Sequence, residues 1–200
     1  RAVHTYTPGG ALFVQSILAT AIFWGMSFLI GGMEYLRLCF VWPSMRRFGP
    51  VGFFFGLASC FAFMAQMCLT PGSYMLYTAA AIVVVPGMWR LTFRIRMPFL
   101  AWLHIVMTGV GILMYCLADL SRNDRGSDEK LGVCFITMKV ILAGAASVFA
   151  ELSLKGGTNI KDMPLTVQVA YILPWKALAC LCSIVFVAPH RLPPSDVRPG

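Results

Sequence analysis

Several ionisable residues lie inside long apolar stretches of this sequence, where a charged side chain is costly and therefore usually functional. Lys139 has apolar neighbours on both sides, and Lys176 lies midway through a later apolar stretch. Each ammonium group could bind an anionic substrate or pair with a carboxylate, although a lysine can also extend its side chain to the membrane surface. Glu151 and Lys155 are four residues apart, a spacing that also suits an ordinary ion pair on a helix.

Tyr77 and Gln168 are further candidates for a binding site, because they too fall within apolar stretches. A single polar residue on an apolar helix more often bonds to a neighbouring helix than to a ligand. The sequence has no paired intramembrane aspartates and no motif of a serine hydrolase, a zinc protease or an ATP-binding loop. Its seven cysteines show no zinc spacing. We therefore predict no catalytic residue, no metal site and no cofactor, and we do not expect an enzyme.

The composition indicates that membrane-spanning helices position these residues. Of the 200 residues, 58% are hydrophobic and only 12% are charged, and the mean hydropathy is +0.76. A soluble domain has about 25% charged residues. The formal net charge is +8, but the basic residues lie mostly between apolar stretches, which suits membrane topology better than binding of nucleic acid. We predict an all-α polytopic membrane protein that does not bind nucleic acid.

Six apolar stretches are long enough to cross a bilayer, whose core of about 30 Å requires roughly 20 apolar residues per helix. They span residues 11–33, 51–69, 73–93, 98–120, 131–152 and 165–188. Residues 189–200 form a polar, proline-rich tail that cannot be a helix. The first and third loops are basic, whereas the second has no lysine or arginine. This pattern predicts that the first and third loops are cytoplasmic, and that residues 1–10 are lumenal.

Small residues recur in these stretches at positions where two helices could approach closely. Gly52 and Gly56 are four residues apart, Gly109 and Gly111 flank a valine, and residues 143–146 are alanine and glycine only. Faces of small residues pack helices in lipid, where no hydrophobic effect holds them together. We predict that each of these groups lies at a helix–helix interface.

Two segments near the end of the fifth apolar stretch form an ordered pair of motifs: residues 146–155 are ASVFAELSLK, and residues 164–168 are PLTVQ. They resemble the segment SGFAGVYFEKILK and the start of the next helix, LWVRN, in the nucleotide-sugar transporters, which belong to the drug/metabolite transporter superfamily. Upstream, residues 94–96, Trp102 and residues 109–111 follow the family's order of a basic loop, a tryptophan and a Gly-Val pair. The motifs keep this order over most of the chain.

The resemblance implies a ten-helix transporter built from two inverted repeats, of which this chain would hold about six helices. It also implies exchange of cytosolic nucleotide sugar for lumenal nucleoside monophosphate across a Golgi or endoplasmic-reticulum membrane. Two family contact positions differ in this sequence. Ala81 stands where the family carries a lysine that faces the nucleotide, and Val169, beside Gln168, stands where it carries an asparagine.

Six residues are therefore our candidates for substrate binding: Tyr77, Lys139, Glu151, Lys155, Gln168 and Lys176. The expected partners are the nucleotide sugar, the nucleoside monophosphate and the lipid bilayer, and the sequence is compatible with a homo-oligomer. Two other functions agree with the same sequence. The first is a drug/metabolite-type permease for another small metabolite, which Ala81 favours. The second is a membrane scaffold without transport, which would tolerate loss of the charges at Lys139 and Lys176.

Overall fold

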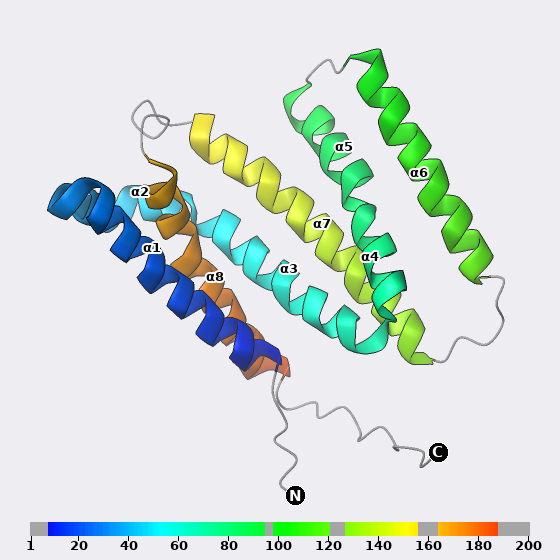
Figure 1. The fold of residues 1–200 in the computed structure, drawn as a ribbon, viewed down its shortest axis with the longest axis horizontal. Helices are drawn as coiled ribbons and strands as arrows, with labels where there is room; N and C mark the ends of the chain where they lie inside the picture. The colour runs from blue at the N-terminus through cyan, green and yellow to red at the C-terminus, as the bar shows by residue number, and fades with distance from the viewer. Residues whose placement is uncertain (1–7, 95–97, 121–126, 156–163, 188–200) are drawn as a thin grey trace, which may run out of the picture.

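The computed structural model describes residues 8–94, 98–120, 127–155 and 164–187, and its regular elements there are all helices (Figure 1). They are α1 (Pro8–Leu38), α2 (Trp42–Arg47), α3 (Gly49–Cys68), α4 (Pro71–Ala79), α5 (Ala81–Phe93), α6 (Phe99–Leu120), α7 (Ser127–Lys155) and α8 (Leu165–Val187). Because the described part of the chain holds no strand, the predicted all-α class is confirmed.

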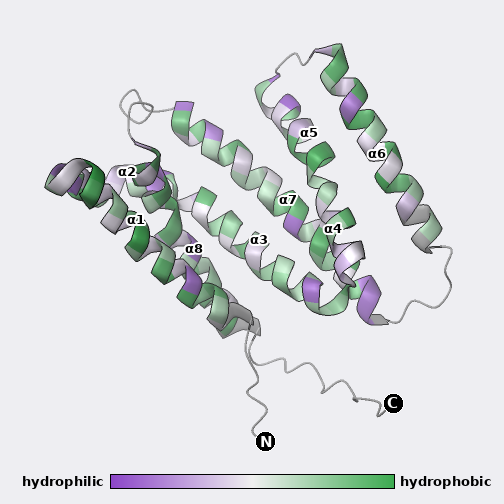
Figure 2. Cartoon of the chain, viewed as in Figure 1, coloured by the Kyte–Doolittle hydropathy of each residue, from purple (hydrophilic) through white to green (hydrophobic). Residues whose placement is uncertain are grey.

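The helices are built to cross a membrane. Five helical stretches of the described chain are long and apolar enough: α1, α3, α4 together with α5, α7, and α8. The described apolar part of α6, Phe99–Tyr115, is shorter. Figure 2 shows that hydrophobic residues recur along the whole length of these helices. Many of the large apolar side chains are exposed, and Leu29 and Leu91 are 82% and 83% exposed. Such a surface is unfavourable in water but normal against lipid, so the chain is an integral multi-pass membrane protein.

Besides shifts of a few residues at most helix ends, the helices differ from the six predicted apolar stretches in three features. The backbone of α1 leaves the helical conformation at Gly32 (φ 64, ψ −153), one residue before the predicted end, and the helix then continues to Leu38. The predicted first loop contains α2, where Pro43 lies in the first turn and its missing N–H costs nothing. The predicted stretch 73–93 is divided at Ala80 into α4 and α5.

Two predicted segments fall mostly outside the described residues. Of the predicted lumenal segment 1–10, residues 8–10 belong to α1, and the others are not described. The predicted proline-rich tail, 189–200, also lies outside the described residues.

Helix α3 is the centre of the bundle, because it packs against α7 on one side and against α8 on the other (Figure 1). Helix α1 packs along α8, and α5 packs along α7. Two glycines of α3, Gly52 and Gly56, allow α3 and α8 to pack in close contact. A Cβ atom added to Gly52 would lie 2.7 Å from Cβ of Trp175, and one added to Gly56 would lie 2.8 Å from the carbonyl oxygen of Lys176. The predicted packing role of this glycine pair is confirmed.

The other two groups of small residues have different outcomes. A Cβ added to Gly144 would lie 2.6 Å from Sδ of Met88, so the predicted close approach of α7 to its neighbour α5 is also confirmed. The prediction for Gly111 is wrong, because nothing lies within 4 Å of a Cβ at that position. Gly109 makes only an ordinary contact, at 3.6 Å from Val83. The glycines of α6 therefore do not form a tightly packed face in the described part of the chain.

Cys60 of α3 and Cys180 of α8 offer a direct test of this packing. Both thiols are buried, and their sulfur atoms are 4.0 Å apart. A disulfide requires about 2.05 Å, so a small shift suffices. We expect a membrane-permeant oxidant to form a disulfide between Cys60 and Cys180, which links α3 to α8. After cleavage in a loop between them, the two fragments should stay together on a non-reducing gel. The Cys180→Ala variant should release them, and release from the unsubstituted protein would contradict the α3–α8 pairing.

Consecutive spanning helices run in opposite directions, so their ends gather in two groups. The ends of α1, α5 and α7 and the starts of α3, α6 and α8 form one group, which we name the basic end. Its charged residues in the described chain are Arg37, Arg46, Arg47, Arg90, Arg94 and Lys155, with Glu34 and Glu151. The opposite end carries Asp128, Glu129 and Lys130. By the positive-inside rule, the basic end is predicted to face the cytoplasm.

At the basic end, side chains of α7 and α8 hold the segment that joins α1 to α3. The hydroxyl of Tyr171 donates to the carbonyl oxygen of Leu38. Nε1 of Trp175 donates to the carbonyl oxygen of Met45 at 2.9 Å, and the hydroxyl of Ser153 donates to that of Arg47 at 3.2 Å. Buried hydrogen bonds to backbone carbonyls are costly to lose, so α2 has a fixed place over α3 and α8.

Candidate functional site

Lys139 lies within α7, away from both helix ends, and its side chain is half-buried. Its Nζ lies 3.5 Å from the hydroxyl oxygen of Thr78 on α4 and 5.9 Å from the centre of the Tyr74 ring. Both are neutral groups, and among the described residues no carboxylate forms an ion pair with Lys139. The ammonium group therefore has hydrogen-bonding and aromatic neighbours but no counter-ion from this part of the chain.

The chain positions Thr78 and Tyr74 through a well-defined start of α4. Thr70 caps the helix, because its side-chain oxygen accepts a hydrogen bond from the backbone N–H of Ser73, and Pro71 occupies the first turn. Tyr74 and Thr78 follow four residues apart, which places both on one face of α4. That face meets α7 at Lys139.

The same span changes its hydrogen bonding two residues after Thr78, where Ala80 keeps helical dihedrals (φ −58, ψ −22). Helix α4 ends at Ala79, the backbone N–H of Ala80 bonds to the carbonyl of Tyr77 at 3.1 Å, and α5 starts at Ala81. Further along, Pro86 cannot donate a hydrogen bond to the preceding turn. Lys139 thus lies next to a locally irregular part of a spanning helix.

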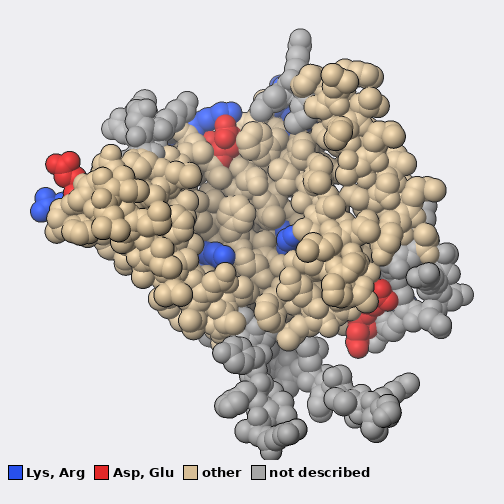
Figure 3. Space-filling view, viewed as in Figure 1, with Lys and Arg blue, Asp and Glu red and all other residues tan. Residues whose placement is uncertain are grey.

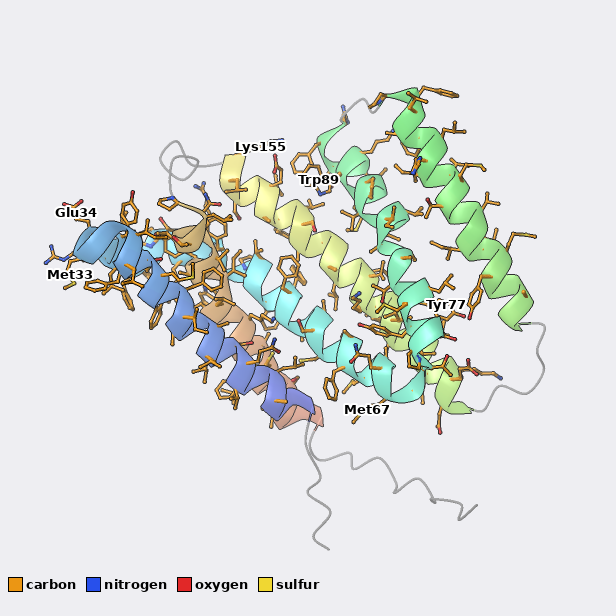
Figure 4. The ribbon with its side chains drawn as sticks, in the orientation of Figure 1. Met33, Glu34, Met67, Tyr77, Trp89 and Lys155 are labelled. Atoms are coloured by element: carbon orange, nitrogen blue, oxygen red, sulfur yellow. The ribbon has the colours of Figure 1, made fainter. Side chains whose placement is uncertain are left out.

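Tyr77 is brought close to this group. Its side chain is buried and packs with Ala65, Leu69 and Ile136, the last of which lies one turn before Lys139 on α7. Figure 4 shows Tyr77 on the α4 span, far from the labelled Lys155 at the basic end of α7. Of the predicted residues, Tyr77 and Lys139 therefore share one helix interface.

Glu151 and Lys155 form an ion pair away from this interface. Their charged atoms are 3.0 Å apart, and their side chains are 25% and 48% exposed. Glu151 is twelve residues beyond Lys139 along α7, which is about 18 Å at 1.5 Å per residue. Nζ of Lys155 also lies 4.5 Å from the centre of the Phe93 ring. The structure places this pair at the basic end, as a helix i,i+4 pair, and does not bring it together with Lys139.

Lys176 and Gln168 lie on α8, on the opposite side of α3 from α7. Lys176 is half-buried, and its backbone lies against Gly56. Gln168 is half-buried in the first turn of α8, next to the half-buried Val169. Figure 3 shows basic groups surrounded by uncharged surface in the middle of the molecule, while most other charges lie toward the helix ends. The six predicted residues thus occupy three separate places.

Sequence reasoning missed Tyr74 and Thr78. A usable signal is present, because Tyr74, Tyr77 and Thr78 place three hydroxyl groups at the spacing of one helix face within an apolar stretch. Among the described residues, no group of three histidine, cysteine or acidic side chains could hold a metal ion. Chemically, the site around Lys139 offers one cation and hydroxyl groups, a combination that binds an anionic oxygen such as that of a phosphate.

Comparison with known proteins does not assign this site. No model of a protein family matches the chain, and no curated protein matches it either.

Proposed function

We propose that the protein is a transporter of an anionic metabolite, and that Lys139 binds the negative charge of the substrate. The observation that carries the proposal is the position of this lysine. It is half-buried inside a membrane-spanning helix, and its neighbours Thr78 and Tyr74 leave its charge uncompensated among the described residues. A buried cation without a counter-ion is costly in a membrane unless a ligand supplies the opposite charge.

The irregular hydrogen bonding of the α4–α5 span supports a transporter over a scaffold. Substrate sites of secondary transporters commonly lie near the middle of the membrane, beside helices whose backbone groups are not all used within the helix. Here the hydrogen bonding tightens at Ala80, two residues after Thr78, the hydroxyl partner of Lys139. In the same span, Pro86 cannot donate to the preceding turn.

Within this proposal, the substrates are a nucleotide sugar and a nucleoside monophosphate, and the membrane is that of the Golgi or the endoplasmic reticulum. The support is the ordered set of motifs together with one geometric relation. The family lysine is replaced by Ala81, but Nζ of Lys139 reaches Thr78, three residues before that position, from a different helix. Lys139 would then supply the cation that Ala81 lacks.

Thermal stability of the full-length protein in detergent tests the proposal. We would compare UMP, CMP, GMP, AMP and simple sugar phosphates. A ligand that binds only the folded state stabilises it by about 2.7 kcal/mol at a hundredfold excess over its dissociation constant. We expect one nucleoside monophosphate to stabilise the protein selectively. Stabilisation by a sugar phosphate alone would favour the broader permease, and no stabilisation by any ligand would contradict transport of these anions.

A further inference from the structure

A groove of about 430 Å³ opens on the surface at the basic end, between α2, α3 and α8. Apolar side chains form its walls: Phe53 and Phe54 come from α3, and Trp175 and Leu178 come from α8. Phe53 and Leu178 are 36% and 43% exposed, so the groove is open to the surroundings of the protein. Of its lining residues, Arg46 alone is charged.

The walls of the groove are held in place by specific contacts. Trp175 is fixed by its hydrogen bond to the carbonyl of Met45, at 2.9 Å, and a Cβ added to Gly49 would lie 3.3 Å from its ring. The ring of Phe54 stacks on that of Phe149, with centroids 5.4 Å apart. A groove with fixed walls loses little entropy when a ligand enters it.

Arg46 gives the groove a polar opening. It lies in the last turn of α2, is exposed, and forms no ion pair with a carboxylate among the described residues. Beside it, the 60% exposed Trp42 has its ring centre 6.3 Å from that of Trp175. Trp42 and Arg46 are residue types that lie at the level of the lipid headgroups. The apolar walls of the groove then lie deeper, at the level of the acyl chains.

We propose that this groove binds one anionic phospholipid, with an acyl chain along Phe53 and Leu178 and the phosphate at Arg46. The apolar walls favour a lipid over a soluble phosphate, which has no apolar part to bury. The guanidinium group can pair with phosphate or carboxylate oxygens in a bidentate way, and its charge favours a headgroup with net negative charge over a zwitterionic one. The basic end is predicted to face the cytoplasm, where the leaflet is rich in anionic lipids.

The test is native mass spectrometry of the full-length protein with phosphatidylserine and phosphatidylcholine that carry identical acyl chains. We expect phosphatidylserine to bind about fivefold more tightly, the effect of one arginine near the membrane surface. Arg46→Gln should remove this preference, so that the two lipids bind alike. Arg94→Gln is the matched control, since Arg94 is an exposed arginine at the same end but directly after α5. Equal binding of both lipids by the unsubstituted protein would overturn the proposal.

A second pair of variants tests the acyl-chain part of the groove. Leu178→Trp should fill the groove and weaken binding of both lipids, and it should fold because Leu178 is 43% exposed. Leu181→Trp is the control, because Leu181 is 41% exposed on the same helix and does not line the groove. Equal lipid binding by both variants would place the lipid elsewhere. A disulfide-linked dimer of Leu178→Cys, without bound lipid, would show that a second copy covers this face.

Discussion

Replacement of Lys139 by methionine should lower the affinity for the nucleoside monophosphate by about 10- to 100-fold, because a hydrogen bond to a charged group contributes about 1.5–3 kcal/mol. Exchange should fall several-fold at substrate concentrations that just saturate the unsubstituted protein. The unliganded protein should remain folded, because Lys139 is only half-buried and its bond to Thr78 is long, at 3.5 Å. Uptake of labelled nucleotide into proteoliposomes and the thermal stability of the variant measure the two effects.

Two further variants make this result specific. Lys130→Met removes the same charge from an exposed position on the same helix, so it should leave exchange unchanged. Lys176→Met removes a half-buried lysine from α8, and a comparable loss of exchange there would extend the site across α3. Normal exchange by Lys139→Met would remove Lys139 from the site and would favour a scaffold or a permease with another binding position.

Replacement of Gly56 by valine should destabilise the protein by about 1–3 kcal/mol or more, the usual cost of inserting methyl groups into a tightly packed interface. A Cβ at this position would lie 2.8 Å from the carbonyl oxygen and 3.2 Å from the Cα atom of Lys176. These are backbone atoms, so α8 must move as a whole to relieve the contact. The free energy of unfolding in mixed micelles measures the change.

Gly111→Val on α6 is the matched control. Nothing lies within 4 Å of a Cβ there, so the same substitution should be close to neutral. A slight gain is expected, since valine has a somewhat higher helix propensity than glycine. If Gly56→Val and Gly111→Val have the same free energy of unfolding, the close contact between α3 and α8 is wrong.

The spanning helices could be predicted from the sequence because their main determinant is local. A run of about 20 apolar residues is sufficient to predict a helix in lipid, where backbone groups must bond within the segment. The turns inside such runs are harder to predict. The boundary between α4 and α5 has no such signal in the sequence. Ala80 is neither glycine nor proline, and it keeps helical dihedrals (φ −58, ψ −22). Helix α2 was expected to be a loop, because Pro43 and Pro50 indicate turns between the first two apolar stretches.

Only part of the candidate site could be predicted. Lys139 is conspicuous because a charge among apolar neighbours is rare, but its partners depend on which face of α4 meets α7, and that is a tertiary property. For Glu151 and Lys155, the four-residue spacing indicated an ordinary helix pair, and the 3.0 Å contact confirms that alternative. Spacing alone misled at Gly111, because a small residue permits close packing without requiring a neighbour to be there.

The break at Gly32 has a mechanical consequence. Beyond it the chain turns back, so that the ring of Phe40 lies 4.8 Å from that of Trp24 on the long arm of α1. The hydrogen-bond ladder of the helix does not run rigidly through this point, and Leu38 is anchored separately by the Tyr171 hydroxyl. The break therefore separates two attachments of α1: the long arm packs along α8, and the last turn is held over α3 and α8 by the Tyr171 hydroxyl.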